Sequence, residues 1–557
     1  MSARAKVTEK NGKVQLQCPD GHDLVLRDGK FGKFYGCSRY HDLKCKKSIG
    51  YQEAQKLIEE FRKPSMPMVF EPSEYQKEIF KWLEFWTKDV IEGPAANTSF
   101  HLVVKADAGS GKTTTIVEAL KTLPKTDKIL FSCFNKAIAN ELARRAPSFA
   151  TVGTLHSVGF SSLKKSLSSK PEVDDSKVWN IAKEIFPEYE DKPLHSPLRK
   201  LVSLVKATLV DPTDLVAIRE VAVHYGVELN GDEDKIVDAI PQAIKMCLER
   251  TYVIDYDDMI WLPIVMDLSL GHYDWVFVDE AQDLNACQLE LVTRLVNSTG
   301  HIVAVGDEKQ SIYGFRGADV DAIPNIIERL DADTLPLGMS YRNATAILDH
   351  VKKELPHVAT EAAPWAEEGV VYYTRYDKMM GEAEDGDLIL CRVNAPLVKA
   401  CYSFIRRGTK AVIRGRDIGK SLLAFIDKLQ PGSLADLLVG ISNYKHEQAE
   451  KLRLANKEDR IESLYDRCDT LTALCEGARD LSELRSNIGK IFNDIQRQGI
   501  ILSSVHRAKG DEADRVYILE PKLMPHPLAK ADWQQAQEQN IKYVALTRAK
   551  RELVYVD

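Results

Sequence analysis

The fold class of this 557-residue chain is indicated by the stretch HLVVKADAGSGKTT, residues 101–114. An apolar run that is typical of a buried strand leads into a glycine-rich loop and then into a segment that favours a helix. Backbone N–H groups of such a loop, together with the N-terminus of the helix behind it, can hold phosphate groups. Lys112 is placed to neutralise the outer phosphates, and the Thr113 hydroxyl to hold a magnesium ion. The stretch therefore predicts a nucleotide site, although Ala106 stands where the strict motif has glycine.

A second stretch, WVFVDEAQD at residues 275–283, supplies carboxylates to the same kind of site. Another apolar strand ends in Asp279 and Glu280, and α/β proteins bind ligands at the carboxyl ends of their strands. We expect Asp279 to hold magnesium and Glu280 to orient and deprotonate a water molecule. Either motif alone is also compatible with a turn or a helix cap. The two in this order indicate an α/β protein that hydrolyses a nucleotide.

The composition agrees with a folded chain of several domains. Hydrophobic residues make up 44% and charged residues 28%, and a prior of about 150 residues per domain suggests about three to four domains. No stretch approaches the roughly 18 apolar residues of a membrane-spanning helix, and the polar start MSARAK lacks the apolar core of a secretion signal. We therefore expect no membrane partner and a cytoplasmic location in a bacterium or a phage-infected host cell, or a nuclear one in a eukaryote.

Charge is unevenly distributed along the chain. Lysine and arginine number 75, and aspartate and glutamate 82, which gives a net charge of −7. Residues 1–50 hold 11 basic and 5 acidic residues, a net of +6 that leaves −13 for the remainder. Charge alone would therefore attract a nucleic acid only to the N-terminal segment. Elsewhere a strand would have to bind in a local groove.

Four residues of the N-terminal segment have the chemistry of a closed structural zinc site. They are Cys18, His22, Cys37 and Cys45. Residues 24–36 between the two halves predict a short hairpin with its turn at Asp28-Gly29. A metal would supply the stability that so small a unit lacks. His41 remains an alternative to His22 as the fourth ligand.

The pattern of this segment resembles the zinc-ribbon repeats of type I topoisomerases. Those repeats bind single-stranded DNA, which the resemblance implies for residues 1–50 here. Aromatic rings among lysines and arginines, such as Phe31 and Tyr35, would suit stacking on unpaired bases. The same rings could instead pack the small core while the lysines form a solvated face. A linker helix is expected over residues 51–67.

Further motifs follow in order along residues 70–557. They are PSEYQ at 72–76, FNKA at 134–137, TLHS at 154–157, GDEKQSIYGFRG at 306–317, SYRN at 340–343, VHRAKGDE at 505–512 and YVALTRAK at 543–550. Together with the first two stretches they resemble the motif series of superfamily 1 helicases, specifically the UvrD/Rep-like group. The FNKA wording is closer to F-box DNA helicases and phage-type relatives than to the bacterial repair enzymes.

The resemblance implies roles for three sets of residues. The nucleotide-binding set would be Gln76, Ala108, Gly109, Ser110, Gly111, Lys112, Thr113, Thr114, Tyr341 and Glu512. The set acting in hydrolysis would be Lys112, Asp279, Glu280, Gln310, Arg342 and Arg548, with magnesium held by Thr113 and Asp279. The DNA-binding set would be Phe134, Asn135, Thr154, His156, Tyr313, Phe315, Arg316, Asn394, His506 and Lys509.

The same resemblance implies the fold class: two RecA-like α/β P-loop motor domains with helical insertions, behind the zinc ribbon of residues 1–50. The expected segments are domain 1A at 68–160 and 252–325, insertion 1B at 161–251, domain 2A at 326–419 and 492–557, and the short insertion 2B at 420–491. Arginines of the second motor domain would reach the γ-phosphate only when the cleft closes. Hydrolysis would thereby be coupled to domain motion.

The implied function is an ATP-dependent DNA helicase or translocase that moves 3′ to 5′ on single-stranded DNA, in replication, repair or recombination. Its cofactors would be ATP, Mg²⁺ and Zn²⁺, and its partners single-stranded DNA and duplex–single-strand junctions. An alternative is a translocase that displaces bound proteins with little duplex unwinding. A passive binding module is disfavoured, because opening about 20 base pairs costs roughly 28 kcal/mol, beyond the roughly 18–21 kcal/mol at which noncovalent affinity saturates.

Overall fold

The structure, a computed structural model, forms two compact units, Met1–Ser73 and Glu74–Asp557. The residues that it describes are 6–10, 13–17, 22–29, 32–38, 48–50, 70–87, 100–133, 136–188, 190–227, 229, 232–312, 322–454, 461–492, 499–529 and 532–557. Within these ranges no helix has the length and apolar character that crossing a bilayer requires.

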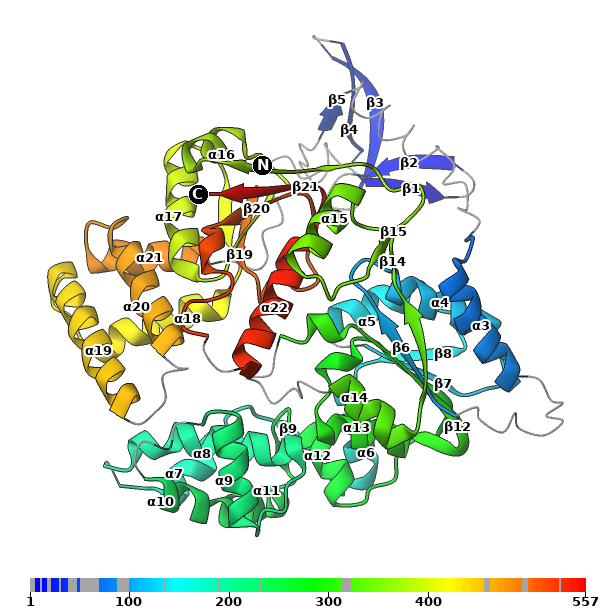
Figure 1. The fold of residues 1–557 in the computed structure, drawn as a ribbon, viewed down its shortest axis with the longest axis horizontal. Helices are drawn as coiled ribbons and strands as arrows, with labels where there is room; N and C mark the ends of the chain where they lie inside the picture. The colour runs from blue at the N-terminus through cyan, green and yellow to red at the C-terminus, as the bar shows by residue number, and fades with distance from the viewer. Residues whose placement is uncertain are drawn as a thin grey trace. The chain divides into compact units, whose positions relative to one another are not determined.

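The first unit contains an antiparallel sheet whose strands follow one another in chain order (Figure 1). Its strands are β1 (Lys6–Lys10), β2 (Lys13–Gln17), β3 (Asp23–Gly29), β4 (Gly32–Cys37) and β5 (Ser48–Gly50). The predicted hairpin is present as β3 and β4, with Gly29 opposite Gly32. The turn prediction was wrong, because Asp28 and Gly29 both belong to β3. The linker helix expected at 51–67 lies outside the described residues.

The second unit contains two six-stranded parallel sheets, as the expected pair of α/β domains requires. The first sheet has the order β13-β6-β12-β11-β7-β8. Its strands are β6 (Leu102–Ala106), β7 (Ile129–Ser132), β8 (Ala150–Gly153), β11 (Tyr273–Val278), β12 (Val296–Gly306) and β13 (Asp333–Leu337). We call the part of the chain built on this sheet the first domain.

Helices cover both faces of the first sheet, because each strand buries alternate residues on opposite sides. On β11, Val276 and Val278 join one hydrophobic cluster, whereas Trp275 and Phe277 join another. The first cluster includes residues of α6 (Leu155–Ser166), α12 (Asp258–Val265), α13 (Ala286–Leu295) and α14 (Ala322–Leu330). The second includes residues of α3 (Glu74–Thr87), α4 (Lys112–Thr122) and α5 (Lys136–Leu142).

The boundary between the two α/β domains differs from the one expected from the sequence. Residues from 326 onward were assigned to the second domain, but β13 pairs in parallel with β6 of the first sheet. β13 is an edge strand, where Pro336 is tolerated because its missing N–H need not join a ladder. The first sheet therefore extends to Leu337.

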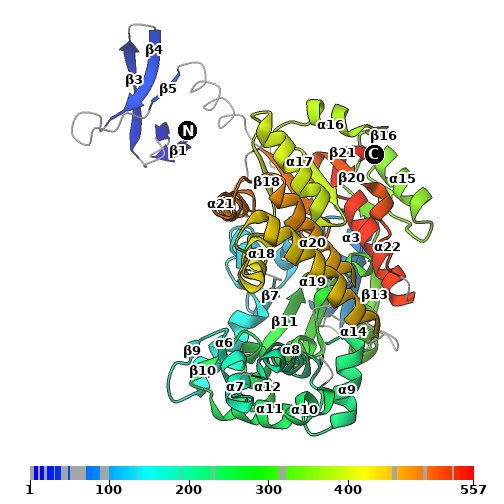
Figure 2. The same ribbon diagram turned by 90° about the vertical axis from the view of Figure 1, so that its left-hand side faces the viewer.

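A helical segment interrupts the first domain, as expected for residues 161–251. Its helices are α7 (Lys177–Ile185), α8 (Lys192–Thr208), α9 (Leu215–His224), α10 (Glu233–Asp238) and α11 (Ile240–Glu249). Short parallel strands, β9 (Glu172–Val173) and β10 (Val253–Ile254), pair where the chain leaves and re-enters the first domain. Both views show α7–α11 gathered together (Figures 1 and 2).

The second sheet has the order β16-β21-β20-β17-β19-β18, and we call the part built on it the second domain. Its strands are β16 (Val370–Thr374), β17 (Leu388–Cys391), β18 (Ala411–Ile413), β19 (Ile500–Ser504), β20 (Ala513–Leu519) and β21 (Ala549–Val556). Helices on its two faces include α15 (Thr345–Glu354), α16 (Tyr376–Glu382), α17 (Asn394–Arg406) and α22 (Asp532–Leu546). The helices between β18 and β19 are α18 (Arg416–Leu429), α19 (Leu434–Leu454), α20 (Ile461–Cys475) and α21 (Leu481–Ile491).

Candidate functional site

The glycine-rich loop, which we call the phosphate loop after its expected role, connects β6 to α4, as the sequence predicts. Gly109 and Gly111 have positive φ angles of 73° and 77°, which glycine adopts without strain. A Cβ at Gly109 would lie 2.5 Å from Ser340 Oγ and 2.7 Å from the Cβ of Arg342. A larger residue at Gly109 would therefore displace the segment that carries Arg342, so this glycine lets the second domain approach the loop.

The magnesium-binding residues expected from the sequence lie together beyond β6 and β11. Thr113 Oγ1 donates a hydrogen bond to Asp279 Oδ2 at 3.0 Å. A hydroxyl and a carboxylate are hard oxygen donors of the kind that Mg²⁺ prefers. Glu280, the next residue, has a positive φ of 55°. Such a backbone conformation is unusual for a non-glycine residue and is often found at functional sites.

Charged groups around Lys112 set the ionisation of the two acidic residues. Lys112 Nζ lies 3.8 Å from Glu280 Oε1. Burial acts to raise the pKa of Glu280, but Lys112 and Lys509 outweigh it and hold that pKa well below its usual range. Burial raises the pKa of Asp279, and the neighbouring charge of Glu280 adds to the effect. Glu280 is therefore ionised at neutral pH.

Both arginines expected from the second domain lie at this loop. Arg548 is 1% exposed, and its Nη2 lies 3.5 Å from Gln310 Oε1. Burial lowers the pKa of Arg548 to about 10, and the positive charge of Arg342 contributes. Arg342 forms an ion pair with Glu512 at 2.6 Å, and Lys550 binds the other oxygen of Glu512 at the same distance. Glu512, predicted to bind nucleotide, thus holds Arg342 in this structure.

Two members of the expected nucleotide-binding set, Gln76 and Tyr341, also lie together. Gln76 Nε2 donates to Thr115 Oγ1 at 2.8 Å, and Tyr341 Oη donates to Gln76 Oε1 at 3.5 Å. The Tyr341 N–H donates to the Gly109 carbonyl at 2.8 Å, which places the tyrosine beside the phosphate loop. Trp365, which the sequence analysis did not single out, is 71% exposed, and its ring centroid lies 6.0 Å from that of Tyr341.

Comparisons with known proteins bear on this arrangement. Residues 90–331 match the model of the UvrD/REP helicase N-terminal domain, and residues 320–556 match that of the UvrD-like helicase C-terminal domain. The chain belongs to the UvrD-like helicase family. The fold and the order of the motifs along this UvrD-like helicase chain agree with that assignment.

Curated relatives of this UvrD-like helicase include DNA helicases of fungi and bacteria. An F-box DNA helicase protein 1 from Schizosaccharomyces pombe is 25% identical over 82% of this chain and 55% of its own length. An ATP-dependent DNA helicase PcrA from Leuconostoc citreum is 25% identical over 52% of this chain and 42% of its own length. A PcrA from Bacillus subtilis is 24% identical over 51% of this chain and 42% of its own length. The chain thus spans about half the length of the curated relatives it matches.

The residues expected to contact DNA have mixed outcomes. Phe134, Asn135, Tyr313, Phe315 and Arg316 lie outside the described residues. Of the others, Thr154 caps α6 by accepting a hydrogen bond from the Ser157 N–H at 3.2 Å, and burial lowers the pKa of His156. His506 is half-buried at the turn after β19.

Two members of the expected DNA-binding set make other contacts. The backbone N–H and the Nδ2 of Asn394 both donate to the Asp466 carboxylate at 2.7 Å. Lys509 Nζ lies 2.7 Å from Asp283 Oδ2 and 4.0 Å from Glu280 Oε2, and its side chain is only 9% exposed. Lys509 thus lies with Asp283 and Glu280 rather than on an exposed surface, and its contact with DNA stays a prediction.

Several residues of the site were quoted in motifs but received no role from the sequence. Gln282 donates to the Glu280 carboxylate through Nε2 and accepts from the Asp307 N–H at 3.0 Å. Asp283 is paired with Lys509, and burial raises its pKa to about 6 although Lys509 opposes the rise. Asp307 accepts from Gln310 Nε2 at 2.6 Å. Their position beside Glu280 and Gln310 in the motifs was the available signal.

Two of the four predicted zinc ligands, His22 and Cys37, belong to the residues that the structure describes. His22 Nδ1 lies 3.6 Å from the buried Cys37 Sγ, so two of the expected ligands are adjacent. Cys18 and Cys45, like the alternative ligand His41, lie outside the described residues. Within the described ranges no group of three or more potential metal ligands occurs.

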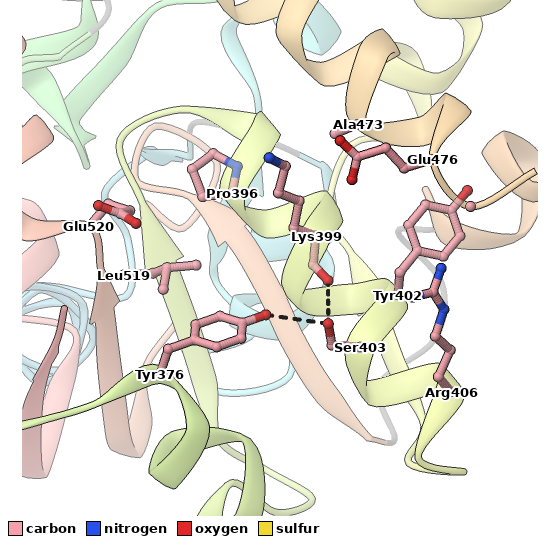
Figure 3. A pocket seen from close by; sticks show the side chains of 11 residues that line it. Tyr376, Pro396, Lys399, Tyr402, Ser403, Arg406, Ala473, Glu476, Leu519 and Glu520 are labelled. Atoms are coloured by element: carbon pink, nitrogen blue, oxygen red, sulfur yellow. Dashed lines mark hydrogen bonds between the residues drawn. The ribbon is translucent and has the colours of Figure 1, made fainter.

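A cavity of about 320 Å³ lies in the second domain (Figure 3). Its lining includes Lys399 and Arg406 of α17 and also the acidic residues Glu476 and Glu520. Tyr376 Oη donates to Ser403 Oγ at 3.5 Å across it. None of the expected site residues lines this cavity, so the chemistry described above does not use it.

Proposed function

We propose that this chain is an ATP-dependent DNA helicase that moves along single-stranded DNA in the 3′ to 5′ direction. One observation carries the proposal: Arg342 and Arg548 of the second domain lie at the same loop as Lys112 and Glu280 of the first. A site that needs both domains can couple hydrolysis to their relative motion. The names of the relatives support DNA as the track.

The residues at the loop fit a magnesium-bound triphosphate. Lys112 supplies a cation, and Thr113 and Asp279 supply hard oxygen ligands. Ser110 Oγ is buried in the loop and, among the residues that the structure describes, finds no hydrogen-bond partner. Such a group needs a polar ligand to be satisfied. When bound, ATP with magnesium would supply the phosphoryl bond that is broken and the metal charge that polarises it.

The side chains divide the chemical work between them. Glu280, kept ionised by Lys112 and Lys509, would orient water and take its proton. Gln310 contacts Arg548. A change in the position of Gln310 when a phosphate fills the outer position would therefore be transmitted to the second domain. Arg342 would have to leave Glu512 to reach a phosphate, because its guanidinium is now paired with that carboxylate. This exchange of anionic partners would draw the domains together, and its reversal would let them part.

The first prediction concerns the response to DNA. We expect ATP hydrolysis to rise strongly when single-stranded DNA is added, and duplexes with a 3′ overhang to be unwound in preference to those with a 5′ overhang. A steady-state ATPase assay with oligothymidylate and a strand-separation assay with both kinds of tailed duplex measure this. An ATPase rate indifferent to the strand would contradict a motor, and stimulation without strand separation would favour the protein-displacing translocase.

We propose further that residues 1–50 bind zinc through Cys18, His22, Cys37 and Cys45 and help to hold the strand. The support is the contact between His22 and the buried Cys37, together with the net charge of +6 in this segment. Imidazole and thiolate are the ligands that structural zinc takes. A bound metal would link the end of β4 to the start of β3, where the sheet has few residues to form a core.

The second prediction tests that site. Replacing Cys37 by serine should release zinc and weaken binding of single-stranded DNA, while unstimulated ATP hydrolysis continues, because the phosphate loop is in the other unit. Zinc content is measured by elemental analysis and DNA affinity by fluorescence polarisation. Cys475→Ser, which alters another buried cysteine in α20, is the control and should keep its zinc. Full metal content in Cys37→Ser would disprove the proposed site.

A further inference from the structure

The hydroxyl of Tyr543 is buried between the phosphate loop and the residues that follow β12. The Ala108 N–H donates to Tyr543 Oη at 2.8 Å, and Tyr543 Oη donates to Asp307 Oδ2 at 3.3 Å. A phenol has one proton to donate and can also accept, so both bonds can exist together. Burial raises the pKa of Tyr543 well above its usual value, and the carboxylates of Asp307 and Asp107 add to the rise. The hydroxyl therefore keeps its proton at neutral pH.

This hydroxyl belongs to a chain of hydrogen bonds from Ala108 through Tyr543, Asp307 and Gln310 to Arg548, which crosses between the two domains three times. Asp307, which accepts from Tyr543, also accepts from Gln310 Nε2 on the same oxygen at 2.6 Å. Gln310 Oε1 in turn lies 3.5 Å from Arg548 Nη2. Tyr543 lies in the last turn of α22, which ends at Leu546, and Arg548 follows two residues after that end. A displacement of this helix end would therefore act on Ala108 and on Gln310 at once.

The same helix also contacts the residues that precede Tyr313, the first member of the expected DNA-binding set in this motif. Gln537 Nε2 donates to the Ile312 carbonyl at 3.1 Å, and Asn540 Nδ2 donates to the Ser311 carbonyl at 3.1 Å. Gln537, Asn540 and Tyr543 are spaced by three residues, which places them along one face of α22. The side chains on this face contact residues between 307 and 312, and Tyr543, the last of them, also contacts the phosphate loop. Tyr313, Phe315 and Arg316, which the sequence analysis expects to contact the strand, follow Ile312 in the sequence.

We infer that Tyr543 is a positioning residue that transmits strand binding to the phosphate loop. The inference rests on the proposed function, because it requires a strand-stimulated ATPase. Tyr543 touches no reacting atom, and it acts by fixing Ala108 relative to Asp307 and thus to Gln310. A strand that shifts residues 307–312 along α22 changes the position of this hydroxyl, and the loop moves with it. The two sites are coupled because they share one rigid element.

The third prediction is a change in coupling on replacing Tyr543 by phenylalanine. The ring stays in its cluster of buried residues, and only the hydroxyl is lost. We expect the ratio of ATPase rates with and without saturating oligothymidylate to fall by about tenfold, within the roughly 5- to 150-fold range of coupling between sites. Strand affinity and the KM for ATP should change by less than about threefold, since the residue contacts neither ligand. The ratio does not depend on the fraction of folded protein, so a simple loss of stability would leave it unchanged.

Tyr555→Phe is the matched control. Tyr555 is buried in the same hydrophobic cluster, and its hydroxyl binds His350 Nε2 at 2.7 Å within the second domain. The control should keep the wild-type ratio. An unaltered ratio in Tyr543→Phe, an equal fall in both variants, or a fall explained by lost strand affinity would overturn the inference. A wild-type enzyme without strand stimulation would instead refute the proposed function.

Discussion

Replacement of Glu280 by glutamine should lower the rate of ATP hydrolysis by about 10²- to 10⁴-fold, the usual contribution of a general base, while ATP still binds. The amide keeps the volume of the side chain and can still accept a hydrogen bond from Gln282, so the local packing is retained. It cannot take a proton from water. The loss should therefore appear in kcat, because Lys112 and Thr113 remain to hold the phosphates and the metal.

The charge around Glu280 explains why the expected effect is large. Its carboxylate is ionised because Lys112 lies 3.8 Å away and Lys509 4.0 Å away. Glutamine removes the negative charge that balances these two lysines in a buried site, where charges interact more strongly than in water. Nucleotide affinity should consequently be equal to or tighter than that of the wild type, since the phosphates no longer face a nearby carboxylate.

The measurements are steady-state hydrolysis with saturating oligothymidylate and equilibrium binding of a fluorescent ATP analogue. Glu118→Gln is the matched control, because Glu118 lies on helix α4 behind the same loop and its carboxylate pairs with Lys121, whose side chain is 51% exposed. Exposed pairs of this kind contribute about 0–1 kcal/mol, so the control should hydrolyse ATP normally. Turnover in Glu280→Gln at the control rate would remove Glu280 from the proposed role.

The residues that the sequence assigns to a nucleotide site lie together in the structure, because the signals for them are local. The loop at 101–114 and the strand at 275–283 each combine an apolar run with polar residues at one end, and parallel strands bring such ends to one edge. The second domain was harder to delimit. β13 carries Pro336 and lies at a sheet edge, so its residue pattern does not distinguish it from a connecting loop.

Contacts between distant segments could not be derived from local patterns. Lys206 is 1% exposed because Asp255 and Asp258 bind it at 3.0 and 2.8 Å, about fifty residues along the chain. In the sequence it reads as an ordinary helix lysine. The β1–β2 hairpin, in contrast, could have been predicted from Asn11-Gly12, which stands between two segments with alternating apolar residues. This is a strong hairpin signal, and the sequence analysis did not use it.

Replacement of Arg548 by lysine should lower kcat by about 10³-fold or more, as loss of an arginine finger does in other NTPases. Lysine keeps the charge but lacks the planar fork of donors. All three nitrogen atoms of the Arg548 guanidinium make contacts. Nε donates to the Val544 carbonyl at 3.0 Å, Nη1 donates to the Asp511 carbonyl at 3.3 Å, and Nη2 faces Gln310. A single ammonium group cannot make these contacts and also reach a phosphate.

Arg551→Lys is the control for this change, because Arg551 lies three residues further along the chain and its side chain is 57% exposed beside Glu367. Hydrolysis should be unchanged in the control, and nucleotide binding should persist in both variants. If Arg548→Lys hydrolysed ATP at the control rate, charge alone would suffice at this position and the guanidinium would have no special part in the reaction. The second domain would then contribute to hydrolysis through Arg342 alone, and the coupling of chemistry to closure would depend on the exchange of Arg342 between Glu512 and the phosphate.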